Sequence, residues 1–294
     1  MSSTKSEYSG KSLQRRVTIS PLRYPGGKGS LYSKLKLLVR ANSLTQGTYV
    51  EPYAGGAGAA LALLVTGQVQ RIVINDLDPA VHAFWTSLVS EPDRFSERVQ
   101  KADLTVKEWS RQKEIYLGSA ADSFELGFAT FYLNRTNRSG VLNGGPIGGM
   151  DQTGNYKIDA RFNKEALTER MRVIGLHARR ISVTNDDGMK VIRKYARRSN
   201  SFIYADPPYF DKAGSLYLNS FGASDHAKLA ECLNGYADTK WVLTYDNVPQ
   251  VHALYSERRN ALFSLNYSAH RVVKAQEVMV FSDQLTVPSN LDDH

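Results

Sequence analysis

Two short segments of this sequence combine residues that could bind a small ligand and move a group onto a planar amine. The first, EPYAGGAG at residues 51–58, places glycines after an expected strand and before an expected helix. Glycines there allow a tight turn and a close approach of the backbone to a ligand. Asp76 ends the next expected strand, where an acidic side chain can bind the hydroxyls of a ribose. Gly55, Gly56 and Asp76 therefore predict a site for an adenosine-containing cofactor; a turn with packing duties is the alternative.

The second segment is ADPPYF at residues 205–210, where two consecutive prolines must end an apolar strand. It fixes the Asp206 carboxylate, the Pro207 carbonyl and the Tyr209 ring relative to one another. The exocyclic amine of a base is a poor nucleophile because its lone pair is delocalised into the ring. Two hydrogen-bond acceptors on its two N–H groups can favour a tetrahedral nitrogen, and this makes the lone pair available. Stacking on Tyr209, worth about 1–3 kcal/mol, helps offset the cost of flipping a base. Asp206, Pro207 and Tyr209 are thus the predicted catalytic residues.

A third segment, PLRYPGGKGSL at residues 21–31, surrounds two glycines with Arg23, Tyr24 and Lys28. It could bind an anion ahead of a helix. Gly29 follows Lys28 where a phosphate-binding loop of a nucleoside triphosphatase has Ser or Thr, so that activity is not expected.

Seven short β-branched or aromatic runs predict the strands that position these segments. They cover residues 48–53, 71–76, 180–185, 201–206, 241–246, 262–268 and 277–282. Helical patterns at 57–64, 79–89 and 186–198 alternate with the early ones. The alternation predicts a parallel sheet covered by helices, in which ligands bind outside the carboxyl ends of the strands. Four of the expected strands end at or near the acidic residues Glu51, Asp76, Asp206 and Asp246.

The middle of the chain, residues 85–180, interrupts this alternation. It predicts two helices, near 91–116 and 121–134, and then a glycine-rich loop or hairpin beginning NRTNRSG. We expect an inserted second domain there.

Composition limits the class of protein. The 294 residues have an ordinary globular balance and a formal net charge of +8, which favours an acidic partner, nucleic acid first. The single cysteine excludes a disulfide framework and a cysteine-rich zinc site, and fits a reducing cytoplasm. The six histidines lack the spacing of metal ligands, so no metal is expected. No apolar run approaches the roughly 18 residues of a membrane span, and residues 1–19 are expected to form a flexible tail.

The motifs RYPGGK, EPYAGGAG, VINDLD and DPPY, in that order, resemble the Dam-type (D12 class) adenine-specific DNA N6-methyltransferases. The resemblance implies an α/β fold: a Rossmann-like S-adenosylmethionine-dependent methyltransferase sheet, here expected over residues 20–84 and 181–294. It also implies an inserted, mainly helical target-recognition domain, here residues 85–180. Tyr24, Lys28, Asp76 and Asp206 match cofactor-binding positions, and Asp206 also matches the catalytic aspartate. Many members have a third glycine where this chain has Ala57.

The resulting hypothesis is a site-specific enzyme that methylates a flipped adenine in double-stranded DNA. Candidate DNA-binding residues are Arg135, Asn137 and Arg138 in the glycine-rich segment and Lys190, Arg193 and Arg197 on an expected helix. Phosphate binding or turn formation is the alternative for the first set, and a solvated helix face for the second. Methylation of an RNA adenine or a protein amide, and a DNA- and cofactor-binding module without chemistry in a defence complex, remain alternative functions. A restriction enzyme or a defence-system component is a candidate partner.

Overall fold

The computed structural model describes residues 19–23, 31–118, 122–210, 221–268 and 272–291. Tyr24 and Lys28, which were expected to bind the cofactor, lie outside these ranges, as does nearly all of the expected tail. Within the described ranges, no helix is long and apolar enough to span a membrane.

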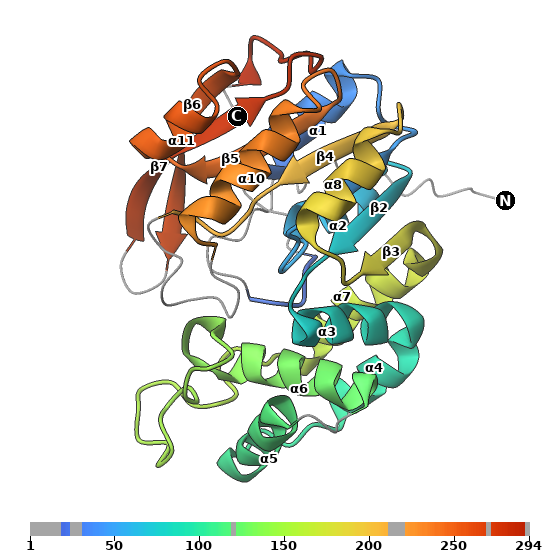
Figure 1. The fold of residues 1–294 in the computed structure, drawn as a ribbon. Coiled ribbons are helices and arrows are strands. Elements are labelled where there is room, and N and C mark those ends of the chain that lie inside the picture. The colour runs from blue at the N-terminus through green and yellow to red at the C-terminus, as the bar shows by residue number, and fades with distance from the viewer. Residues whose placement is uncertain (1–18, 24–30, 119–121, 211–220, 269–271, 292–294) are drawn as a thin grey trace, which may run out of the picture.

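A seven-stranded sheet forms the centre of the molecule, with the strand order β3-β2-β1-β4-β5-β7-β6 (Figure 1). All seven predicted strands are present. Their bounds are β1 Thr48–Glu51, β2 Arg71–Asn75, β3 Ile181–Thr184, β4 Ser201–Ala205, β5 Trp241–Asp246, β6 Arg259–Ser268 and β7 Val272–Phe281. The first five run parallel, whereas β7 is antiparallel to both β5 and β6. The expected α/β fold class is therefore confirmed.

Helices cover both faces of the sheet. Because neighbouring residues of each strand point to opposite faces, they pack in two different cores. Tyr49 and Ile72 pack in one core with helices α1 (Tyr32–Ala41) and α2 (Gly58–Val65). Val50 and Val73 pack in a second core with three other helices. These are α8 Gly188–Ala196, α10 Ala223–Asn234 and α11 Pro249–Leu254.

Between β2 and β3 the described chain is mainly helical and lies to one side of the sheet (Figure 1). Its helices are α3 Pro79–Ser90, α4 Pro92–Gln100, α5 Val106–Leu117, α6 Ser123–Thr136 and α7 Lys164–Leu176. The single helix expected near 91–116 is two helices, because Thr105 accepts a hydrogen bond from the Glu108 amide and starts a new helix there. The helix α7 was not foreseen.

The helical segment shares its hydrophobic core with the sheet. Phe84, Phe95 and Phe131 belong to the same buried cluster as Tyr49 and Ile72 of β1 and β2. At Gly127 of α6 a Cβ atom would lie 2.6 Å from the Ala83 carbonyl oxygen of α3, so only glycine lets the two helices approach this closely. The segment is thus held firmly against the sheet, and its expected role in recognising the target stays a prediction.

Candidate functional site

The carboxyl ends of β2, β1 and β4, which are neighbours in the sheet, bring three predicted acidic residues to one edge. Glu51 ends β1, Asp76 follows β2, and Asp206 follows β4. β2 leads from this edge directly into α3, so the helical segment lies beside it (Figure 1). The three acidic residues thus share the edge that the sequence predicts, and ligand binding there stays a prediction.

Asp76 holds the glycine loop through its carboxylate. Its Oδ2 accepts a hydrogen bond from the Gly55 amide at 2.9 Å, and its Oδ1 accepts one from the Asp78 amide at 3.0 Å. Each oxygen retains a further lone pair with which it can accept a ligand hydroxyl. Burial raises the pKa of Asp76 to about 6, although hydrogen bonds from these amides oppose the shift.

Side chains on both sides also fix the glycine loop itself. The Trp85 indole of α3 donates to the Gly55 carbonyl at 2.8 Å, and the Ser20 hydroxyl donates to the Gly56 carbonyl. Gly55 and Ala57 have φ angles of 47° and 46°, in the left-handed region that favours glycine. The left-handed φ of Ala57 suits the glycine that the family resemblance leads one to expect at this position.

Glu51 is buried just behind this loop. Its Oε1 accepts hydrogen bonds from the Tyr49 hydroxyl and the Ala60 amide, both at 3.0 Å. Burial raises the pKa of Glu51 to about 8, and the nearby charge of Asp206 adds to the shift. The carboxyl group therefore joins β1 to the start of α2 and leaves Glu51 protonated over part of the neutral range.

Asp206 is held by a buried residue of the neighbouring strand. Thr244 of β5 donates a hydrogen bond to Asp206 Oδ1 at 2.8 Å. Because that bond uses the only proton of the Thr244 hydroxyl, the Tyr204 hydroxyl, 2.9 Å away, must donate to Thr244. The resulting chain runs Tyr204, Thr244, Asp206.

The segment after Asp206 has two further supports. The Tyr209 hydroxyl donates to Oε1 of Glu277 at 2.7 Å, and Glu277 is a buried residue of the antiparallel strand β7. The Phe210 amide donates to Asp246 Oδ1 at 3.3 Å. The sequence did not single out Thr244 or Glu277, because their nearness to Asp206 and Tyr209 depends on the strand order.

The glycine-rich segment after α6 is a loop, closed by an isolated antiparallel bridge between Asn137 and Pro146. Asn137 is fully buried. Its amide nitrogen donates to the carbonyls of Val141 and Leu142, and its Oδ1 accepts from the Trp109 indole at 2.6 Å. These bonds favour turn formation over a base contact, since a base contact would require the network to open.

The neighbouring arginines differ from each other in exposure. Arg138 is exposed at the surface of the loop, and Arg135 is half-buried. Burial, together with the charges of Arg170, Arg23 and Arg161, lowers the pKa of Arg135 to about 9. Both residues stay candidates for DNA binding.

The basic side chains of α8 spread along a helix that runs back across the sheet. Lys190 lies in the first turn, near the carboxyl edge, and forms an ion pair with Asp186 at 2.6 Å. Arg193 and Arg197 are exposed, but Arg197 follows the end of α8 near the start of β4, at the opposite edge. Only Lys190 is therefore close to the edge that carries Asp76 and Asp206.

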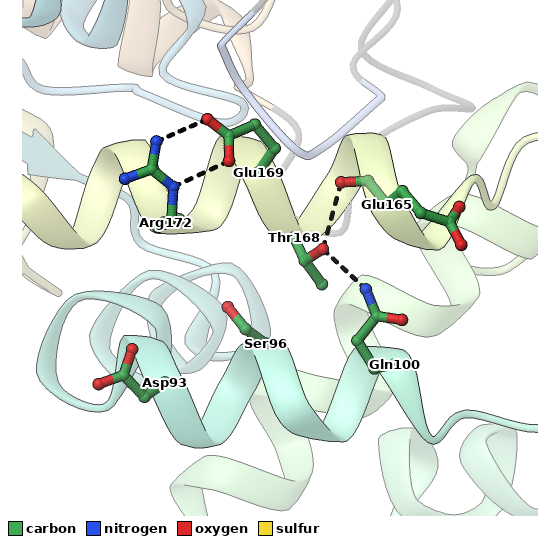
Figure 2. A pocket seen from close by; sticks show the side chains of 7 residues that line it. All are labelled: Asp93, Ser96, Gln100, Glu165, Thr168, Glu169 and Arg172. Atoms are coloured by element: carbon green, nitrogen blue, oxygen red, sulfur yellow. Dashed lines mark hydrogen bonds and ion pairs between the residues drawn. The ribbon is translucent and has the colours of Figure 1, made fainter.

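A polar groove of about 410 Å³ between α4 and α7 contains none of the predicted site residues (Figure 2). Its walls carry Asp93, Glu165 and Glu169, and Glu169 forms an ion pair with Arg172. Their negative charge does not suit a polyanion. Among the residues that the structure describes, no group of three or more His, Cys, Asp or Glu side chains could hold a metal ion.

Comparison with known proteins gives one family match for this chain. The family model described as D12 class N6 adenine-specific DNA methyltransferase matches residues 24–276. The sequence has no significant match among curated proteins. Among solved structures, the chain is similar to the rRNA methyltransferase aviRa from Streptomyces viridochromogenes, with 14% identity and a TM-score of 0.38 over 82% of this chain and 78% of that one.

Proposed function

We propose that this chain, which belongs to the D12 class of N6 adenine-specific DNA methyltransferases, methylates an adenine flipped out of double-stranded DNA with S-adenosylmethionine as the methyl donor. The observation that carries the proposal is the arrangement of Asp76, the glycine loop and Asp206 along one edge of the sheet. Ligands of open α/β sheets bind at this edge.

The residues at the edge fit the proposed cofactor. The Asp76 carboxylate, with a spare lone pair on each oxygen, suits the hydroxyls of the ribose. Gly55 and Gly56, held by Asp76 and Ser20, leave room for the methionine part beside the loop. Tyr24 and Lys28 complete the proposed cofactor set. When bound, S-adenosylmethionine supplies a methyl group that its sulfonium activates.

Asp206, Pro207 and Tyr209 act on the target base. The Asp206 carboxylate and the Pro207 carbonyl accept the two N–H bonds of the amino group, and Tyr209 stacks on the ring. The nitrogen lone pair forms the new N–C bond while the methyl–sulfur bond breaks and sulfur keeps that electron pair. The methylated nitrogen then loses one proton. Thr244 and Glu277 act indirectly, because they hold Asp206 and Tyr209.

The helical segment of residues 85–180 recognises the target in this proposal, with Arg138 as the base-edge candidate on an exposed part of its loop. The enzyme acts in the cytoplasm, where a restriction enzyme or a defence-system protein would be its partner.

Transfer of labelled methyl from S-adenosylmethionine to unmethylated double-stranded DNA tests the proposal. The wild type is compared with Asp206→Ala and with Asp93→Asn, which removes an exposed carboxylate from the groove between α4 and α7. Single-molecule sequencing then locates the methylated positions. We expect label on adenine with the wild type and with Asp93→Asn, and none with Asp206→Ala at unchanged thermal stability.

Parallel reactions with RNA and with protein acceptors separate the alternatives. Methylation of either one, without methylation of DNA, would replace the proposed substrate. Tight binding of cofactor and DNA without transfer to any acceptor would identify a binding module instead. Full activity of folded Asp206→Ala would contradict the mechanism.

A further inference from the structure

Four arginines from three separate segments meet beside the start of the glycine-rich loop. Arg23 precedes α1, Arg135 lies in the last turn of α6, Arg161 precedes α7, and Arg170 is on α7. Arg135 is within electrostatic range of the other three, and Arg23 is within range of Arg161. Like charges repel at such separations, so an anion bound among these cations would stabilise them.

The described part of the chain supplies no such anion. None of the four arginines forms an ion pair there, although nine other ion pairs occur among the described residues. The Nε atom of Arg135 is buried and has no hydrogen-bond partner. A buried donor without a partner is uncommon in a folded protein and often marks the place of a ligand. Here the missing partner must be an acceptor, and the surrounding positive charge favours a negative one.

Contacts with backbone groups hold the cluster in shape, and the Arg23 guanidinium itself donates to the Asn137 carbonyl at 3.2 Å. Asn134 bonds to the Arg23 amide at 2.7 Å and to the Arg23 carbonyl at 2.8 Å, which ties the segment before α1 to α6. Arg170 donates to the Ser20 carbonyl at 3.1 Å. The Ser20 hydroxyl in turn bonds to the Gly56 carbonyl of the glycine loop. The cluster is therefore linked through one residue to the loop at the proposed cofactor site.

We propose that Arg23, Arg135, Arg161 and Arg170 bind one backbone phosphate of the DNA strand that carries the target adenine. Guanidinium groups match the geometry of phosphate oxygens and can bind them bidentately. The link to the glycine loop places this phosphate close to the base that is flipped, where an anchored backbone helps to hold the extruded nucleotide. The inference rests on the proposed function, and it changes the role of Arg135 from a base contact to a phosphate contact.

The salt dependence of DNA binding tests the proposal. Dissociation constants for a short duplex containing the methylated site are measured between 50 and 200 mM salt, a range over which phosphate contacts change affinity strongly. The variants are Arg135→Gln, Arg161→Gln and, as the control, Arg172→Gln. Arg172 lies on α7 near Arg170 but is paired with Glu169. Arg161 is exposed, so its replacement keeps the test valid if Arg135→Gln fails to fold.

We expect Arg135→Gln to weaken binding roughly tenfold at low salt and to reduce the slope of log K against log salt by about 0.9, the value of one phosphate. Arg161→Gln should also reduce both the affinity and the salt slope, and Arg172→Gln should match the wild type in both. Cofactor affinity, measured without DNA, should not change in any variant.

Duplexes with a single uncharged methylphosphonate identify the phosphate. One position near the target adenine should weaken wild-type binding and have no further effect on Arg135→Gln. The inference would be overturned if the salt slopes of Arg135→Gln and Arg161→Gln equalled that of Arg172→Gln. It would also be overturned if every methylphosphonate weakened Arg135→Gln as much as it weakened the wild type. In either case, methylation of adenine by the wild type would leave the proposed function intact. Absence of wild-type DNA binding would overturn both.

Discussion

The Thr244 hydroxyl donates a hydrogen bond to Asp206 Oδ1 across 2.8 Å and joins β5 to the DPPY segment that follows β4. Thr244 is completely buried, and its own acceptor site is used by Tyr204. A carboxylate oxygen held by a buried hydroxyl keeps a fixed orientation, which the role proposed for Asp206, holding an amino group, would need. Two side chains with no direct part in the chemistry thus orient Asp206.

Replacing Thr244 by valine should lower kcat by about tenfold, because it removes one hydrogen bond worth about 1.5 kcal/mol to a charged acceptor. The KM values for cofactor and DNA should change little, since neither is expected to contact Thr244. Steady-state methylation kinetics check this, with Thr244→Ser as the variant that keeps the hydroxyl and should restore most of kcat. A higher KM with unchanged kcat would assign Thr244 a role in binding instead.

Glu277 should position Tyr209 through the 2.7 Å hydrogen bond between them. Tyr209→Phe and Glu277→Leu, each of which removes one partner of this bond, should each reduce activity several-fold, and the double variant should be no worse than the more damaging single one. Coupling of about 1 kcal/mol in this double-mutant cycle is the expected result. Strictly additive losses would show that the two side chains act independently.

Cofactor binding should weaken as the pH falls through 6. Burial raises the pKa of Asp76 to about 6. In the proposed site the ribose hydroxyls need the carboxylate as acceptor, and protonation below that pH removes it. The dissociation constant for S-adenosylmethionine should therefore rise about tenfold per pH unit below 6 and level off above 7. Equilibrium titration from pH 5 to 8 measures it. Asp76→Asn should bind weakly at every pH, and an unaltered pH profile in that variant would point to another group.

Glu51→Gln should stabilise the protein at pH 8. The folded state raises the pKa of Glu51 from 4.5 to about 8 through burial, so the folded protein binds a proton that the unfolded chain has lost. The stability from this group is complete below pH 4.5 and is lost as the pH rises through 8. Glutamine keeps the oxygen that accepts from Tyr49 and Ala60 but carries no charge.

Urea unfolding from pH 5 to 8 measures this effect without cofactor. The free energy of unfolding of Glu51→Gln should exceed that of the wild type at pH 8, and the difference should shrink toward pH 5. Glu165→Gln removes an exposed carboxyl of α7 and serves as the control. A difference that is constant with pH would mean that Glu51 is not protonated by burial.

Asn137→Ala should loosen the glycine-rich loop. It removes three hydrogen bonds to Val141, Leu142 and Trp109, and leaves the Trp109 indole without its acceptor. The expected loss of stability is about 1–3 kcal/mol, together with weaker binding to DNA of any sequence. Thermal unfolding and binding to two unrelated duplexes check it; a change in target sequence at unchanged stability would instead support a direct base contact.

The sequence alone predicted all seven strands and placed Glu51, Asp76 and Asp206 at one edge of the sheet. Short β-branched runs interrupted by glycine and proline are local signals, and the order of DPPY after EPYAGGAG needs no knowledge of distant contacts. Acidic residues at strand ends could be assigned to one edge because parallel strands share their carboxyl ends.

Only the tertiary structure decided which side chains support that site. Thr244 reaches Asp206 because β5 lies beside β4, and Glu277 reaches Tyr209 because β7 lies antiparallel beside β5. Likewise, the burial of Asn137 and the meeting of Arg23 with Arg135 depend on how the helical segment packs against the start of the chain. These contacts join residues far apart in sequence, and their energies come from packing and burial, which no local pattern of residue types encodes.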